Sequence, residues 1–203
     1  RQRQMCIRDR LKPGEEYDFD GERRVYPDTR LVYWCGGNPF HHHQDLNRLA
    51  DAFRRPESVI VHEPFWTATA RHADIVLPAT TTLERNDIGA GKRDNLWSAM
   101  HQAIPPVHQS WNDHDIFAGL ADRLDIGEAF TEGKSEMDWL REMYETAAKG
   151  AADRGVELPE FDQFWAEGGV ELPHPKEPHI LLGKFRNDPE LSLIHISEPT
   201  RQP

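Results

Sequence analysis

Three consecutive histidines stand at positions 41–43, inside the stretch GGNPFHHHQDLN at positions 36–47. Histidine nitrogens are common zinc ligands, so a metal site is the first chemistry that this stretch suggests. Zinc ligands must converge, usually from spacings such as His-x-x-x-His on one helix face, whereas consecutive side chains point in different directions. The sequence has no HExxH motif, and its two cysteines, Cys6 and Cys35, lack CxxC spacing. We therefore expect no metal ligand among these residues, and solvated or helix-capping histidines are the simple alternative.

The glycines of the same stretch favour a second chemistry, which is nucleotide binding. Gly36 and Gly37 directly follow LVYWC at 31–35, a β-branched and aromatic run typical of a buried strand. Glycine lets the backbone approach a ligand, and a helix that begins after it would offer unpaired N–H groups to a phosphate. Asn38 can donate and accept hydrogen bonds there, and His42 can donate one. The pattern departs from GxGxxG, so the motif by itself is weak.

Strands and helices alternate along the segment that must position these residues. After the strand at 31–35, apolar runs predict strands at 58–62 and 74–79. Between them, the amphipathic pattern at 43–56 predicts a helix that ends at Pro56, and 67–73 can form a short one. This alternation favours parallel pairing with right-handed crossovers. The predicted fold class is α/β, with a Rossmann-like doubly wound parallel sheet and additional packing helices.

The packing helices are expected in the second half of the chain. Apolar stripes at helical spacing predict one helix from about Asp113 and another that ends before Gly150. A third, short helix is expected within 159–169.

In doubly wound sheets, ligands lie beyond the carboxyl ends of the strands. Glu63 follows the second strand, where an acidic residue commonly accepts hydrogen bonds from a ribose or a purine; an ordinary loop carboxylate is the alternative. Arg85 follows the third strand, and its planar guanidinium suits phosphate or guanine oxygens. Its alternative is a surface ion pair with Glu84 or Asp87. Asp115 is a further candidate, although it could instead cap the helix that begins near it.

Composition excludes several classes of function. The formal net charge is -11 and the chain has no basic stripe interleaved with aromatic residues, which argues against nucleic acid as a partner. No run of about 18 apolar residues is present, so we expect no membrane segment in this sequence. Neither a GxSxG nor a Walker motif occurs. From the residues alone, the chain is interpreted as a nucleotide-binding α/β domain without chemistry of its own.

The two ends of the chain match none of these patterns. One permitted coding of Met5 to Arg10, read as its reverse complement, translates as LSLIHI, which is the sequence at 191–196. Both ends resemble translated adaptors of a transposon-based sequencing library. We therefore interpret 1–10 and 191–203 as assembly artefact and exclude them from the fold. On this interpretation residues 11–190 are a piece of a longer gene, and the compartment, periplasmic or cytoplasmic, stays open.

The remaining sequence closely resembles the molybdopterin oxidoreductases of the dimethyl sulfoxide reductase family, in the subgroup that contains dimethyl sulfoxide, trimethylamine N-oxide and biotin sulfoxide reductases. The stretch ARHADIVLPAT followed by ERNDI is highly specific for it. The resemblance is carried by VYWCGGNPFHHHQDLNRL (32–49), IVHEPFWTATARHADIVLPATTTLERNDI (60–88), DIFAGLADRL (115–124), FTEGKSEMDWL (130–140) and LPEFDQFWAEGGVELP (158–173).

This resemblance implies that 11–190 is the molybdopterin guanine dinucleotide-binding α/β domain of a larger enzyme. The cofactor would be bis(molybdopterin guanine dinucleotide) molybdenum, and the parent would reduce an S-oxide or N-oxide by oxygen-atom transfer. The resemblance places cofactor contacts on Asn38, His42, His62, Glu63, Arg85 and Asp115. It places the serine that ligates molybdenum in an earlier domain, so no metal ligand and no catalytic residue is expected here.

Two other hypotheses belong to different classes of protein. The chain could be a stand-alone nucleotide-binding module, or a metal-dependent hydrolase that uses the histidine cluster. If the family interpretation holds, the partners are the remaining domains of the parent enzyme and, through them, a small S-oxide or N-oxide. The chain expressed alone is then expected to be inactive and marginally stable, because its inter-domain faces are exposed.

Overall fold

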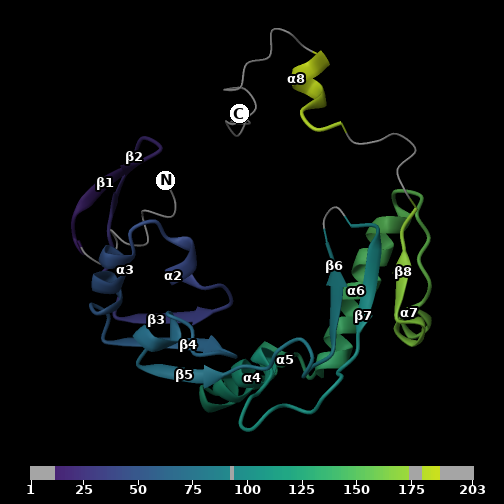
Figure 1. The fold of residues 1–203 in the computed structure, drawn as a ribbon, viewed down its shortest axis with the longest axis horizontal. Coiled ribbons are helices and arrows are strands. Elements are labelled where there is room, and N and C mark those ends of the chain that lie inside the picture. The colour runs from purple at the N-terminus through teal and green to yellow at the C-terminus, as the bar shows by residue number, and fades with distance from the viewer. Residues whose placement is uncertain (1–11, 92–93, 174–179, 188–203) are drawn as a thin grey trace.

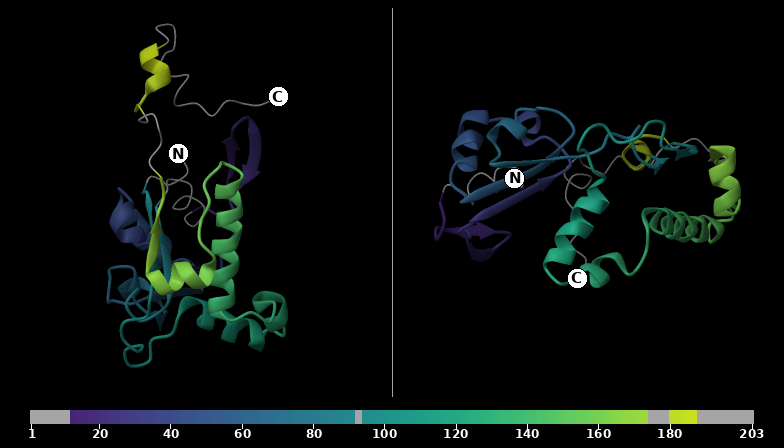
Figure 2. Two further views of the ribbon diagram at one scale, coloured as in Figure 1. Left: turned by 90° about the vertical axis from the view of Figure 1, so that its right-hand side faces the viewer. Right: turned by 90° about the horizontal axis from the view of Figure 1, so that it is seen from below.

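Two lobes, each built on a three-stranded sheet, make up the computed structural model (Figure 1). It describes residues 12–91, 94–173 and 180–187. The interpretation of 1–10 and 191–203 as artefact therefore concerns residues outside the described part. The lobes lie next to each other rather than one over the other (Figure 2).

The first lobe contains a parallel sheet in the order β3-β4-β5. Its elements are β3 (Leu31–Cys35), α2 (Pro39–His42), α3 (Leu46–Phe53), β4 (Ser58–Glu63), the 3-10 turn η1 (Ala70–His72), β5 (Ile75–Pro78), α4 (Asp113–Arg123) and α5 (Gly127–Thr131). A hairpin of β1 (Glu16–Phe19) and β2 (Glu22–Val25) precedes it. The three predicted strands and their parallel pairing are confirmed.

The helix predicted over 43–56 is shorter than expected. The Asp45 carboxylate accepts a hydrogen bond from the Arg48 backbone N–H at 3.1 Å, and this cap starts α3 at Leu46. His41 and His42 belong instead to the separate single turn α2.

Alternate side chains of the first sheet pack on opposite faces. Val32, Val59 and Val61 are buried against Leu49 and Phe53 of α3, and they form the core of this lobe. Because side chains alternate along a strand, the intervening residues face the other side, where α4 lies. That side is covered only in part and leaves an apolar groove of about 400 Å³. The groove is lined by Tyr33, Ile60, Ile75, Leu77, Pro78, Gln109, Trp111, Ile116, Gly119, Leu120 and Arg123.

The second lobe contains an antiparallel sheet in the order β6-β7-β8. Its elements are β6 (Asp87–Ala90), β7 (Leu96–Met100), α6 (Glu136–Ala152), α7 (Phe161–Glu167) and β8 (Gly169–Glu171). The sequence did not predict this sheet, because its strands are short and mix glycine, alanine and serine with apolar residues. Helices α6 and α7 pack on one of its faces, through a core of Ala99, Leu140, Tyr144, Phe161 and Phe164.

The packing helices of the second half form close to where they were expected. Helix α4 begins at Asp113 and α7 lies within 159–169, as predicted. Helix α6 is longer than predicted, because it continues through Gly150 to Ala152. It begins with a capping box between Ser135 and Asp138, which satisfies backbone N–H groups of its first turn.

A last short helix, α8 (Gly183–Asn187), follows the undescribed residues 174–179. Among all the described residues, no helix is long and apolar enough to cross a membrane.

Candidate functional site

The loop after β3 has the backbone that the glycine pair was expected to provide. Gly36 and Gly37 have φ values of 78° and 70°, in the left-handed region that other residues rarely adopt. A Cβ added at either position would meet no heavy atom within 4 Å. The glycines are therefore required by the backbone conformation, and the space above them is open to a ligand.

A helix begins directly after these glycines, as expected, but it is short. Helix α2 is a single turn, and its first residue is Pro39, which has no N–H to donate. The first turn of the longer helix α3 is already capped by the Asp45 carboxylate, whose negative charge opposes an anion. The sequence pattern did not separate the two helices, and phosphate binding at this helix N-terminus stays a prediction.

Two threonines before η1 hold the predicted side chains at the ends of β3 and β4. Thr69 Oγ1 donates a short hydrogen bond to Asn38 Oδ1. Thr67 Oγ1 donates to Glu63 Oε1 at 2.9 Å. Sequence reasoning missed both threonines; Thr67 lies four residues from its partner, whereas the partner of Thr69 is 31 residues away and no local pattern reveals it. Asn38 and Glu63 thus lie at one edge of the sheet, and both are held by hydrogen bonds from the segment between β4 and η1.

His62 connects the sheet to α4. Its side chain is 1% exposed, Nδ1 lies 2.6 Å from Asp113 Oδ1, and Nε2 lies 2.7 Å from the Tyr33 hydroxyl. Both ring nitrogens are thus engaged within the protein, and His62 also lies in the central strand of the sheet, between Cys35 and Leu77. The ring itself holds the first turn of α4 against the end of β4.

The histidine cluster is not arranged as a metal site in this structure. His41 and His42 are exposed on α2, and His41 Nδ1 lies 3.4 Å from Asn38 Nδ2. Within the parts of the chain that the structure describes, no group of three or more His, Cys, Asp or Glu side chains is placed to hold a metal ion.

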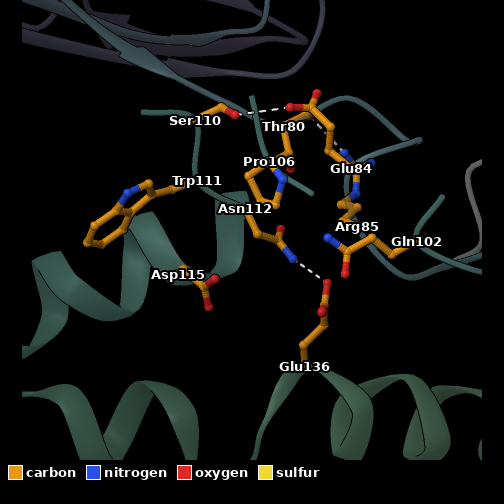
Figure 3. Close-up of a pocket in the computed structure, with 10 residues that line it drawn as sticks. All are labelled: Thr80, Glu84, Arg85, Gln102, Pro106, Ser110, Trp111, Asn112, Asp115 and Glu136. Atoms are coloured by element: carbon orange, nitrogen blue, oxygen red, sulfur yellow. Dashed lines mark hydrogen bonds between the residues drawn. The ribbon is translucent and has the colours of Figure 1, made fainter. Parts of the chain in front are cut away.

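A polar pocket of about 460 Å³ lies where the two lobes meet (Figure 3). We call it the junction pocket. It is lined by Thr80, Glu84, Arg85, Gln102, Pro106, Ser110, Trp111, Asn112, Asp115 and Glu136. Of the six predicted contacts, Arg85 and Asp115 line this pocket; Asn38, His62 and Glu63 lie at or just after the strand ends, and His42 lies on α2. The hydrogen bond between His62 and Asp113 connects the two groups.

Arg85 is held in place by the alternative that the sequence left open, an ion pair with Asp87. Its Nη2 and Nε lie 3.1 and 3.3 Å from Asp87 Oδ2, and its Nη1 donates to the Thr80 carbonyl at 3.0 Å. A guanidinium has five N–H donors, so these bonds orient the group and leave donors for a ligand. Glu84, the other candidate partner, bonds elsewhere.

Glu84 is buried and joins two walls of the junction pocket. Its carboxylate accepts from the Thr81 N–H at 2.8 Å, the Thr81 hydroxyl at 2.7 Å, the Val107 N–H at 2.6 Å and the Ser110 hydroxyl at 3.1 Å. These hydrogen bonds, those from Thr81 first, lower the pKa of the Glu84 carboxyl to about 2. The carboxylate therefore fixes the loop that carries Arg85.

Asp115 does not cap α4, so the structural alternative for this residue is not observed. The cap is Asn112, whose side-chain oxygen accepts from the His114 N–H at 3.3 Å. The Asp115 side chain is 62% exposed and lines the pocket. It is thus available to a ligand that offers hydrogen-bond donors.

Sequence reasoning missed two other lining residues that matter for a ligand. The Thr80 residue is 4% exposed, and its hydroxyl oxygen is buried without a partner among the described residues. Glu136, the first residue of α6, is half-buried and accepts a short hydrogen bond from Asn112 Nδ2. Burial raises the pKa of the Glu136 carboxyl, and the charge of Asp115 raises it further. Thr80 carries an unsatisfied group of the kind that a bound molecule satisfies.

A parallel sheet whose strand ends gather polar side chains at one edge is typical of proteins that bind nucleotide-type cofactors. The solved structure of acetylene hydratase from Pelobacter acetylenicus has the same fold over 74% of this chain and 19% of its own, with a TM-score of 0.56 and 18% identity.

Residues 19–123 match the sequence profile of the molybdopterin oxidoreductase family, and the chain belongs to that family. It is 51% identical over 180 residues to a biotin sulfoxide reductase from Cereibacter sphaeroides, covering 88% of this chain and 24% of the relative. It is 50% identical over 185 residues to a dimethyl sulfoxide/trimethylamine N-oxide reductase from Rhodobacter capsulatus, covering 90% and 22%. The chain thus spans about a quarter of the length of these relatives.

Proposed function

We propose that this chain is the cofactor-binding part of a molybdenum oxidoreductase that reduces S-oxides or N-oxides by oxygen-atom transfer. The identity of about half with reductases of this kind supports the substrate class. The proposed segment is 11–190, and we propose that its parallel sheet belongs to a Rossmann-like doubly wound layer. The remaining domains of the parent are its partners and would bring the metal ligand and the substrate.

The cofactor that we propose is bis(molybdopterin guanine dinucleotide) molybdenum, which would supply the redox chemistry of the metal when bound. The observation that carries this proposal is the bridge from His62 to Asp113. It joins the end of β4, which carries Glu63, to the first turn of α4, whose Asp115 lines the junction pocket with Arg85. Polar side chains on both sides of this link suit an extended dinucleotide better than a compact ligand.

The chemistry of the donor set fits one guanine dinucleotide arm. A guanine base presents acceptors at O6 and N7 and donors at N1–H and the 2-amino group. Arg85 can donate to the acceptors, and Asp115 can accept from the donors. Asn38, His42 and Glu63 offer donors and acceptors of the kind that a ribose and a pyrophosphate require. His62, whose ring nitrogens bond to Tyr33 and Asp113, would have to exchange one of these bonds to contact the cofactor through its ring.

On this proposal the chain binds and orients the cofactor but does not act as an enzyme by itself. Its residues contribute position, while the groups that touch the reacting atoms belong to the rest of the parent. The alternative, a stand-alone nucleotide-binding module without catalysis, would use the same pocket for a mononucleotide.

Calorimetric titration of the chain with GDP and ADP tests whether the junction pocket binds guanine selectively. We expect GDP to bind more tightly than ADP, and Arg85→Ala and Asp115→Ala to weaken GDP binding by about 10-fold or more, as for hydrogen bonds that involve a charge. The matched controls are Arg48→Ala and Asp51→Ala, which remove the same charges from the exposed face of α3. Equal effects of the site and control variants would contradict the proposal.

The cofactor released from the longer native protein separates the proposal from its alternative. Acid release should yield an oxidised fluorescent pterin, and two guanine nucleotides for each molybdenum. A protein that carries a mononucleotide and no pterin or molybdenum would support the stand-alone module.

A further inference from the structure

The junction pocket contains a carboxylate that the strand-end argument does not use. Glu136 is contributed by α6, so it reaches the pocket from the second lobe, whereas Arg85 and Asp115 reach it from the loop after β5 and from α4. Figure 3 shows Glu136 pointing from its helix toward Asn112 and the interior of the pocket.

Glu136 is oriented by a chain of hydrogen bonds. Its Oε1 accepts from Asn112 Nδ2, and Asn112 Oδ1 in turn accepts from the His114 N–H that begins α4. Among the described residues, no hydrogen bond is made to the second carboxylate oxygen, Oε2. One oxygen of Glu136 thus fixes the side chain, and the other is left for a ligand.

The position of Glu136 is unfavourable for a charged group in the protein alone. The carboxyl is half-buried, and burial and the charge of Asp115 raise its pKa, although the Asn112 hydrogen bond and the nearby His114 and Arg85 offset part of this effect. Two carboxylates that share one pocket repel each other unless a cationic or donor-rich group lies between them. The pocket therefore favours a ligand whose edge presents more than one N–H donor.

We propose that Glu136 is a specificity-determining residue, which together with Asp115 recognises the donor edge of a guanine base. This inference rests on the proposed function and deepens it. Guanine places N1–H and the 2-amino group side by side, so two acceptors from different helices can each take one donor, Asp115 the N1–H and Glu136 the 2-amino group. Hypoxanthine lacks the 2-amino group, and adenine presents an acceptor at N1. The pair of carboxylates thus selects guanine over both.

The variant Glu136→Gln tests this inference in the 203-residue chain, with GDP and IDP as probes in calorimetric titration. Glutamine keeps an oxygen for Asn112 but removes the charge. We expect GDP affinity to fall by about 10-fold, which corresponds to one hydrogen bond to a charged group, and IDP affinity to change much less. The preference for GDP over IDP should therefore decrease by about the same factor.

Glu145→Gln is the matched control, because Glu145 lies on the exposed face of the same helix. It should leave both affinities unchanged. Thermal unfolding checks that Glu136→Gln is folded, and we expect a melting temperature that is equal or higher, because a repulsion has been removed. If Glu136→Gln did not fold, Glu136→Asp would replace it, since the shorter carboxylate should show the same loss of preference.

The outcomes separate the two proposals. If the wild-type chain binds no GDP, the proposed function of the pocket fails, and this inference fails with it. If GDP binding depends on Arg85 and Asp115 but the GDP/IDP ratio is unchanged in Glu136→Gln, the proposed function stands and the role of Glu136 is overturned.

Discussion

In the first lobe the three strands run in one direction, whereas in the second lobe neighbouring strands run in opposite directions. Parallel strands end at one edge of their sheet, so the loops that follow them bring polar side chains together. Antiparallel strands distribute their ends over two edges. Three of the six predicted contacts, Asn38, His62 and Glu63, accordingly lie at or just after the end of β3 or β4, while the second lobe contributes Glu136 from a helix.

The two lobes also differ in how completely their sheets are covered. The first sheet is buried on the α3 side and leaves an open apolar groove on the α4 side. The second lobe contains a closed aromatic cluster, in which the rings of Tyr144 and Phe164 stack at 4.4 Å and the Tyr144 hydroxyl donates to the Pro159 carbonyl at 2.8 Å. The comparison indicates that the second lobe is a packed scaffold beside the site, whereas the first lobe contributes most of the candidate side chains.

The largest effect is expected from truncating the closed core of the second lobe. Phe164→Ala removes a fully buried ring and should lower the free energy of unfolding by about 3–5 kcal/mol. Urea denaturation followed by fluorescence measures the change. Trp66→Ala is the control, because Trp66 is 71% exposed. A similar loss of unfolding free energy in both variants would contradict a tightly packed core in the second lobe.

Glu84→Gln should have the next largest effect at neutral pH. Four hydrogen bonds converge on this carboxylate, and the amide nitrogen of glutamine cannot accept the two that reach the oxygen it replaces. Its pKa in the folded protein, about 2, lies below the ordinary value of 4.5. The stabilisation by the charged form is thus fully present above pH 4.5 and is lost as the pH falls through about 2. Urea midpoints of the wild-type and variant chains should differ most near neutral pH and converge in acid. A difference independent of pH would exclude this account.

A smaller effect is expected from breaking the link between the strand ends and the pocket. His62→Ala leaves the Tyr33 hydroxyl and the Asp113 carboxylate without their partner, which should cost about 1–3 kcal/mol of unfolding free energy. GDP affinity should also fall, because the first turn of α4 is no longer held. Arg54→Ala, on the exposed C-terminal end of α3, is the control for both measurements. Unchanged GDP affinity in His62→Ala would show that the two groups of contacts are independent.

The smallest effects are expected from a pair of glycine substitutions, one in each lobe. Gly36→Ala places a side chain at a φ of 78° and should cost about 1–2 kcal/mol. Gly150→Ala lies within α6, where an added Cβ meets no atom within 4 Å, and should stabilise the chain by about 0.5–1 kcal/mol. Thermal unfolding should shift in opposite directions. Shifts of the same sign would contradict the assigned backbone conformations.

Much of the first lobe could be predicted because its signals are local. The strands at 31–35, 58–62 and 74–79 are apolar runs closed by glycine or proline, and their alternation with helices is enough to predict parallel pairing. The start of α3 was misplaced, since the choice of Asp45 as its cap depends on one hydrogen bond that no periodic pattern reveals. The strands β6 and β7 were missed because their pairing partners and the helices on them, not their own residues, stabilise them.

The candidate site likewise has features that the sequence predicts and features that only the tertiary structure determines. By itself the sequence determined which polar residues follow which strands, the need for glycine at 36 and 37, and the family, because these depend on residue order and spacing. Tertiary structure decided that the His62 ring is a structural link, that Asn112 rather than Asp115 caps α4, and that Glu136 enters the junction pocket from the other lobe. Contacts between residues far apart in the chain arise only when the lobes meet, so no local pattern encodes them.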